Sequence, residues 1–184
     1  DEVTSPGSLR LRIRSMIESV RRNEGLLRGT THRVSTRLFG REDRSRTILA
    51  PYFAPFYSSF LAAPFEAMGY TLEVLPPSDR ESLEWGLRYT NNEICYPAIL
   101  IIGDVIKALR SGRYDPGSVA IGLTQTGGQC RASNYVPLLR KALVAAGYAG
   151  VPAVSVSTSQ KHQNEQPGFS LNSGTLMRTG LWAI

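Results

Sequence analysis

The stretch SVAIGLTQTGGQCRASNYVPLLRKALVAA, residues 118–146, determines the expected fold. Its first seven residues form a short apolar run, typical of a strand that is buried on both faces. Residues 132–146 then place apolar side chains at helical spacing and stop at Gly147, a residue favoured after a helix. Another apolar run follows at residues 151–157. The stretch therefore predicts a strand, a helix and a second strand, the repeating unit of a parallel sheet.

The same alternation continues towards the N-terminus. Two more short apolar runs predict strands, and three amphipathic segments predict helices. Parallel strands joined by right-handed crossovers pack with helices on both faces of the sheet. We therefore expect an α/β fold, a three-layer Rossmann-like sandwich with a mostly parallel sheet, over residues 47–184. The additional strands are expected at residues 47–52 and 70–75, and the helices at residues 57–68, 81–90 and 97–111.

Residues 1–46, here called the basic arm, differ from the rest of the chain. They contain eleven Arg and six acidic residues, a net charge of +5 out of the +6 of the whole sequence. Apolar side chains recur at three- and four-residue spacing in residues 9–22, which predicts an amphipathic helix, and residues 26–46 are expected to be a connector. Such an arm can bind nucleic acid, an acidic partner or an anionic membrane, but an ordinary solvated helix face is the favoured interpretation.

The chain lacks the sequence features of secretion and of membrane insertion. It has no basic segment followed by the apolar core of a signal peptide, and no apolar run approaches the roughly 18 residues of a membrane span. We therefore expect a cytoplasmic protein with no membrane partner. No nucleic-acid partner is expected either, because the domain is nearly neutral and has no basic–aromatic stretch. The apolar C-terminal end without a stop signal suggests a fragment of a longer protein.

Only two cysteines are present, Cys95 and Cys130. In a reducing compartment they are better suited to metal binding or reactivity than to a structural disulfide. Cys95 precedes a helix that Pro97 helps to start, and Cys130 follows the strand at residues 118–124. Both thiols are thus expected at helix N-termini, whose partial positive charge and free N–H groups favour a thiolate or an anionic cluster. Glycines 127 and 128 allow the backbone to approach a bulky group.

Other interpretations of these motifs stay open. A single buried cysteine is commonly a small hydrophobic residue, and a Thr-Gly-Gly turn is often a plain strand–helix connection. Residues 126–129 could cradle a phosphate, although they lack the Lys-Ser/Thr of a P-loop. His32 and His162 lie in polar stretches without neighbouring metal ligands and are expected at the surface.

The strings NNEICYPAILIIGDVIKAL (residues 91–109) and TQTGGQCRASNYVPLLRKAL (residues 124–143) resemble the acyl-CoA dehydratase activase-related proteins, relatives of the 2-hydroxyglutaryl-CoA dehydratase components. The resemblance covers roughly residues 46–170. It implies an anaerobic system in which Rossmann-like domains bind [4Fe-4S] clusters through cysteines. There an ATP-driven activase injects an electron, and water is eliminated from a 2-hydroxyacyl-CoA. Any enzymatic role of this chain is expected to belong to such a lyase system.

Carried over by motif, the resemblance implies that Cys95 and Cys130 are ligands of a [4Fe-4S] cluster. Two cysteines cannot complete a four-thiolate shell, so other ligands must come from elsewhere. The remaining cofactor-binding candidates are polar or glycine residues around the second cysteine: Thr126, Gly127, Gly128, Arg131 and Asn134. Expected partners are other domains or subunits of a dehydratase/activase system, acyl-CoA, or further copies of the chain. Two alternatives are a non-catalytic subunit-interaction module and a thiol redox pair.

Overall fold

The computed structural model describes residues 35–91, 94–125, 131–156 and 166–172, and nine further positions. The chain divides into two units, Asp1–Val34 and Ser35–Ile184. No helix in these described parts is both long enough and apolar enough to cross a bilayer. The nine further positions are 9, 10, 13, 14, 16, 17, 174, 175 and 178.

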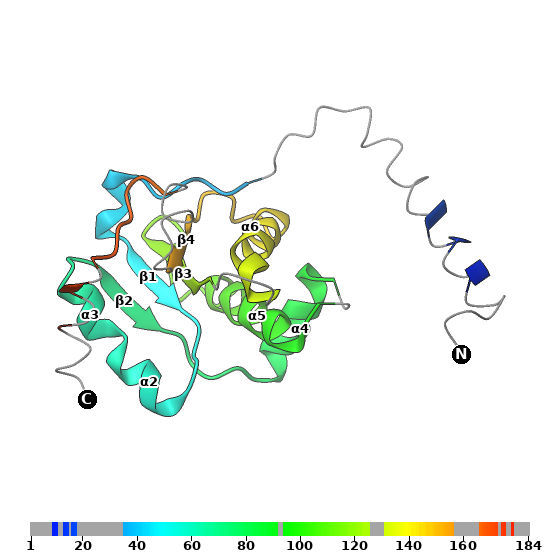
Figure 1. The fold of residues 1–184 in the computed structure, drawn as a ribbon, viewed down its shortest axis with the longest axis horizontal. Helices are drawn as coiled ribbons and strands as arrows, with labels where there is room; N and C mark the ends of the chain where they lie inside the picture. Colours follow the sequence, from blue (N-terminus) through cyan, green and yellow to red (C-terminus); the bar gives the residue numbers. More distant parts are fainter. Residues whose placement is uncertain are drawn as a thin grey trace. The chain divides into compact units, whose positions relative to one another are not determined.

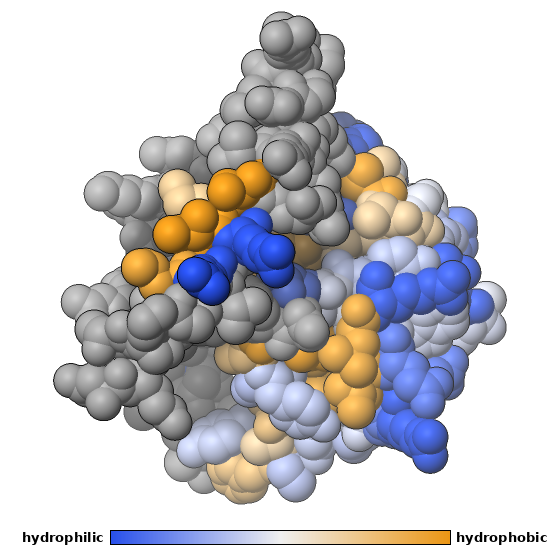
Figure 2. Space-filling view, turned by 90° about the vertical axis from the view of Figure 1, so that its right-hand side faces the viewer, coloured by the Kyte–Doolittle hydropathy of each residue, from blue (hydrophilic) through white to orange (hydrophobic). Residues whose placement is uncertain are grey.

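The first unit is described at six positions, all with helical backbone. They agree with the predicted helix at residues 9–22, whose other residues lie outside the description. The four apolar ones, Leu9, Ile13, Met16 and Ile17, are exposed. In Figure 2, hydrophobic side chains of this segment form an orange row beside blue arginines. The described part of the segment is therefore amphipathic.

The second unit is built on a sheet of four described strands, all parallel, in the order β2-β1-β3-β4 (Figure 1). Each strand lies within a range predicted from the sequence. The observed fold is α/β and Rossmann-like, which confirms the expected fold class. The strands are β1 Thr47–Ala50, β2 Thr71–Val74, β3 Val119–Thr124 and β4 Ala153–Val156.

Alternate strand residues divide the core between the two faces of the sheet, because successive side chains in a strand point to opposite sides. Leu49 and Ile121 pack with α5 (Tyr96–Arg110) and α6 (Tyr135–Ala145) on one face. Their neighbours Ile48 and Ala120 pack on the other face. The cluster there also includes residues of α3 (Ala62–Glu66), of the segment before β1 and of the segment after β4: Phe65, Phe39 and Phe169. These are the three expected layers.

Helix α4 (Arg80–Tyr89) packs directly against α5, and two glycines make the close approach possible. A Cβ atom on Gly86 would lie 2.0 Å from the carbonyl oxygen of Ile99, and one on Gly103 would lie 1.7 Å from that of Ser82. The earlier residue of α4, Ser82, faces the later residue of α5, Gly103, so the two helices run antiparallel. Both helices belong to the connection from β2 to β3, which brings the start of α5 to the carboxyl edge of the sheet.

Two predicted helices are interrupted, in each case near a proline. The helix expected at residues 57–68 is two helices, α2 (Pro55–Phe60) and α3, because Pro64 has no N–H to donate to the carbonyl of Phe60. The helix expected at residues 132–146 begins as a 3-10 helix, η3 (Arg131–Asn134), before α6. Here Pro137 cannot bond the carbonyl of Ser133, and the Gln125 side-chain amide donates to that oxygen instead.

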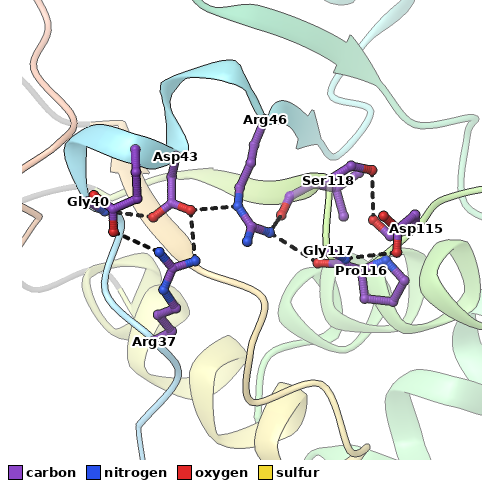
Figure 3. Close-up of polar contacts among 10 residues, drawn as sticks. Arg37, Gly40, Asp43, Arg46, Asp115, Pro116, Gly117 and Ser118 are labelled. Atoms are coloured by element: carbon purple, nitrogen blue, oxygen red, sulfur yellow. Dashed lines mark hydrogen bonds and ion pairs between the residues drawn. The ribbon is translucent and has the colours of Figure 1, made fainter.

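Residues 35–46 belong to the compact unit with the sheet, although their polar, Arg-rich composition predicts a connector within the basic arm. The reason is a buried carboxylate, Asp43, in the 3-10 helix η2 (Arg41–Ser45) (Figure 3). Its Oδ1 atom pairs with Arg37 at 2.8 Å and with Arg46 at 2.6 Å, and its Oδ2 accepts the Gly40 N–H.

This carboxylate stabilises the end of the sheet away from the carboxyl edge. Arg46, just before β1, also donates to the carbonyl oxygens of Pro116 and Val119 at the start of β3. Burial alone would raise the pKa of Asp43. The Gly40 N–H, the Arg46 guanidinium and the charge of Arg37 outweigh that effect and hold this pKa below its ordinary value.

The segment after β4 returns to cover the sheet. The Gln166 side chain is buried and pairs with the backbone of Ser155 in β4, accepting from its N–H at 2.7 Å and donating to its carbonyl at 2.8 Å. Two residues further along the chain, the Gly168 N–H donates a hydrogen bond to the carbonyl oxygen of Phe39. A Cβ atom on Gly168 would collide with the carbonyl oxygen of Gly40. Residues 166–169 thus tie the segment before β1 to the edge strand β4.

Candidate functional site

The strand order identifies one position on the sheet where ligands bind in folds of this kind. The chain leaves β1 towards β2 on one side, and returns through α4 and α5 to β3 on the other side of β1. In open α/β sheets, the crevice lies outside the carboxyl ends of the two strands at which the direction reverses. In this chain they are β1, which ends at Ala50, and β3, which ends at Thr124.

Cys95 lies at the same edge of the sheet. It is the N-cap residue of α5, the position at a helix N-terminus that the sequence predicts for it. Its side chain is half-buried, and its Sγ atom lies 3.0 Å from the phenolic oxygen of Tyr135. Tyr135 is the first residue of α6. The contact therefore brings the N-terminus of α5 next to the N-terminus of α6, and both helices point their positive ends towards this spot.

Cys130 lies outside the described residues, as do Thr126, Gly127 and Gly128. The described chain nevertheless reaches both sides of their segment. Gln125 precedes it, and its side-chain amide bonds the carbonyl oxygen of Ser133. Arg131, the residue after Cys130 in the sequence, begins η3, which leads directly to Tyr135.

The other two candidates flank the start of α6. Arg131 is described in its backbone alone. Asn134 is the N-cap of α6, is exposed, and makes no side-chain cap hydrogen bond. The structure thus places Cys95 near Tyr135 and Asn134 directly before it, within one part of the carboxyl edge.

A buried carboxylate on α5 is separate from this site. Asp104 accepts a hydrogen bond from Ser78 at 2.6 Å, and burial raises the pKa of its carboxyl group despite this bond. Nine residues separate it from Cys95, about 14 Å along a helix. Its neighbour Lys107 pairs with Asp79, the N-cap of α4. These contacts join α4 to α5 and do not reach the carboxyl edge.

The described residues contain no group of three or more His, Cys, Asp or Glu side chains that could hold a metal ion. Cys130, His32 and His162 are outside that description. The chemistry of the donors fits an iron–sulfur cluster in part, since a half-buried thiol between two helix N-termini is a suitable ligand position. A complete four-ligand shell needs donors beyond the two cysteines of the chain.

Tyr135 lies within the second cysteine motif, residues 124–135, but its residue type and position there predict no functional role. Its contact with Cys95 spans 40 residues of sequence. An aromatic residue at the start of a helix usually means core packing, and Tyr135 does pack against the core. No sequence signal distinguishes that role from the additional contact of its hydroxyl group.

Comparison of the chain with protein-family models, with curated proteins and with solved structures finds no match.

Proposed function

We propose that this chain is an iron–sulfur-binding domain of a 2-hydroxyacyl-CoA dehydratase/activase-type system, with Cys95 and Cys130 as two ligands of a [4Fe-4S] cluster. The observation that carries the proposal is the contact between Cys95 and Tyr135. It places one thiol beside α6, and the segment that leads into α6 begins one residue after Cys130.

Electrostatics supports an anionic group at this position. The N-termini of α5, with 15 residues, and α6, with 11 residues, meet at the contact. Each contributes partial positive charge and N–H groups without partners inside the helix. An iron–sulfur cluster with thiolate ligands carries negative charge, and its sulfurs accept hydrogen bonds.

A bound cluster would supply one-electron transfer, or Lewis-acid activation of a substrate oxygen. The protein's part is to hold two thiolates on helix ends and to leave the remaining ligand positions to another domain, subunit, copy or substrate. Acyl-CoA is the substrate class that the resemblance suggests.

Anaerobic reconstitution tests this function. The chain is incubated with iron, sulfide and an excess of a small thiol, which can occupy the ligand positions that the two cysteines leave open. Iron and acid-labile sulfide per chain are then measured with the visible spectrum. We expect loading in the wild-type chain and its loss in Cys95→Ser and in Cys130→Ser.

Tyr96→Phe is the matched control, because Tyr96 adjoins Cys95 in sequence but is exposed. It should load as the wild type does. Equal iron loading in the wild type and in a variant with both cysteines replaced would contradict the proposal, as would no loading of the wild type under these conditions.

A further inference from the structure

We propose that the cavity beside α5 and the segment that follows β2 binds a small primary ammonium ion. The Asp104 carboxylate holds the charged head of this ligand, and the apolar walls of the cavity pack against its carbon chain. The inference does not rest on the proposed function, because Asp104 lies apart from Cys95 on α5.

The cavity is small and mostly apolar. It has a volume of about 150 Å³, and almost all of its accessible wall is apolar. Leu75 and Pro76, which follow β2, form part of this wall together with Ala108 of α5 and Tyr114. A cavity of this size accommodates a molecule about as large as benzene. The cavity reaches the surface, since its lining residue Ser111 is exposed.

Asp104 gives this apolar cavity a polar anchor. The residue is 2% exposed and lines the cavity, and its Oδ2 atom accepts a hydrogen bond from the Ser78 hydroxyl at 2.6 Å. Its buried Oδ1 atom has no hydrogen-bond partner among the described residues. The nearby Ser82 hydroxyl donates to Asp79 instead, at 2.9 Å. A buried carboxylate oxygen without a donor is costly, so the site favours a ligand that brings an N–H group.

The charges around the cavity favour a cation. Two basic side chains line it, but each is paired with a carboxylate that does not. Lys107 pairs with Asp79 at 2.9 Å. Arg113 pairs with Glu73 at 3.5 Å. Among the described lining residues, the negative charge of Asp104 is therefore left without an ion pair.

The ionisation of Asp104 agrees with that imbalance. Burial raises the pKa of its carboxyl group, as expected of an anion that lacks a compensating charge. An ammonium ion supplies this charge together with N–H donors, and the apolar walls suit a short carbon chain.

The test is titration of the full chain with n-butylammonium chloride at pH 8, followed by protein NMR and calorimetry. We expect saturable binding with chemical-shift changes at Ala108 and Tyr114. Butyrate, which has a similar length and the opposite charge, should not bind. Asp104→Asn keeps the shape of the side chain but removes its charge, and it should weaken the affinity at least about tenfold. Ala108→Leu should abolish binding, because it fills the cavity with Asp104 still in place.

Glu66→Gln is the matched control, because it removes one charge from an exposed carboxylate that does not line the cavity. It should bind n-butylammonium as the wild type does. The proposal would be overturned by a wild type that does not bind this ion, by equal binding of butyrate, or by unchanged affinity in folded Asp104→Asn. None of these results bears on iron loading, so the proposed function is tested separately.

Discussion

We expect Gly103→Ala to destabilise the protein, although alanine favours helices more than glycine does. Gly103 lies inside α5, where α4 crosses it most closely. The added Cβ would lie 1.7 Å from the carbonyl oxygen of Ser82 and 2.9 Å from the backbone nitrogen of Gly86. These are backbone atoms of a helix, so no rotation of a side chain can make room.

The magnitude follows from two opposing effects. Real Cβ contacts essentially never fall under 3.0 Å, so the helices must move apart by more than about 1 Å. Overpacking of this kind costs about 1–3 kcal/mol, and rigid backbone on both sides favours the upper end. The better helix propensity of alanine returns about 1 kcal/mol. The net loss should be about 2 kcal/mol, which corresponds to a fall in Tm of about 4–8 °C for a chain of this size.

Urea denaturation followed by far-UV circular dichroism measures this loss. Gly150→Ala is the control, because nothing lies within 4 Å of a Cβ there and its backbone is not in the left-handed region. Its stability should stay within about 0.5 kcal/mol of the wild type. A Gly103→Ala protein as stable as the wild type would refute the close packing of α4 on α5.

Three further predictions concern buried polar groups. Asp43→Asn should cost about 3 kcal/mol, because it leaves Arg37 and Arg46 without their buried partner. The pKa of Asp43 is lowered on folding, so its stabilisation is present above the ordinary value of 3.8 and is lost as the pH falls below it. The urea midpoints of variant and wild type should therefore stay equally far apart from pH 7 to about pH 4 and approach each other below that pH. The pKa of Asp104 is raised on folding, so the ionisation of its carboxyl group costs stability as the pH rises above 3.8. The Asp104→Asn variant should therefore gain stability relative to the wild type between pH 4 and pH 7. A stability difference between variant and wild type that does not change with pH would contradict this. Gln166→Ala should cost about 2–4 kcal/mol in the same assay, since it leaves the N–H and carbonyl of Ser155 unpaired; a loss under about 0.5 kcal/mol would count against the pairing.

The strands and the main helices could be predicted because each is governed by local pattern. Residues 118–124 form an uninterrupted apolar run, and the strand there is buried on both faces. Pro97 and Gly112 bracket α5, whose bounds were expected to within one residue. The parallel arrangement follows from the alternation of strands and helices, but their spatial order depends on tertiary contacts that no local pattern contains.

The interruptions and the start of the compact unit needed more than periodicity. Apolar spacing continues through Pro64 and Pro137, so the pattern extends each helix across a residue that cannot donate the required hydrogen bond. Phe39 is a single aromatic residue in a polar stretch and gives no periodic signal, yet it is almost fully buried. Asp43 is buried because two arginines neutralise it, a condition that is apparent only in three dimensions.

For the candidate site, the setting of Cys95 could be predicted and its surroundings could not. The N-cap position follows from Pro97 and the apolar helix behind it. The approach of Tyr135 depends on how α5 and α6 lie against the same face of the sheet, which the sequence does not encode locally.

The amide of Gln166 has a consequence for self-association. The outer strand of a sheet exposes backbone groups that can recruit a strand from another molecule, a common beginning of aggregation. Gln166 satisfies both outward-facing groups of Ser155 with one side chain, so an incoming strand would have to displace it to pair at that residue. One glutamine thus protects the centre of β4 from intermolecular strand addition.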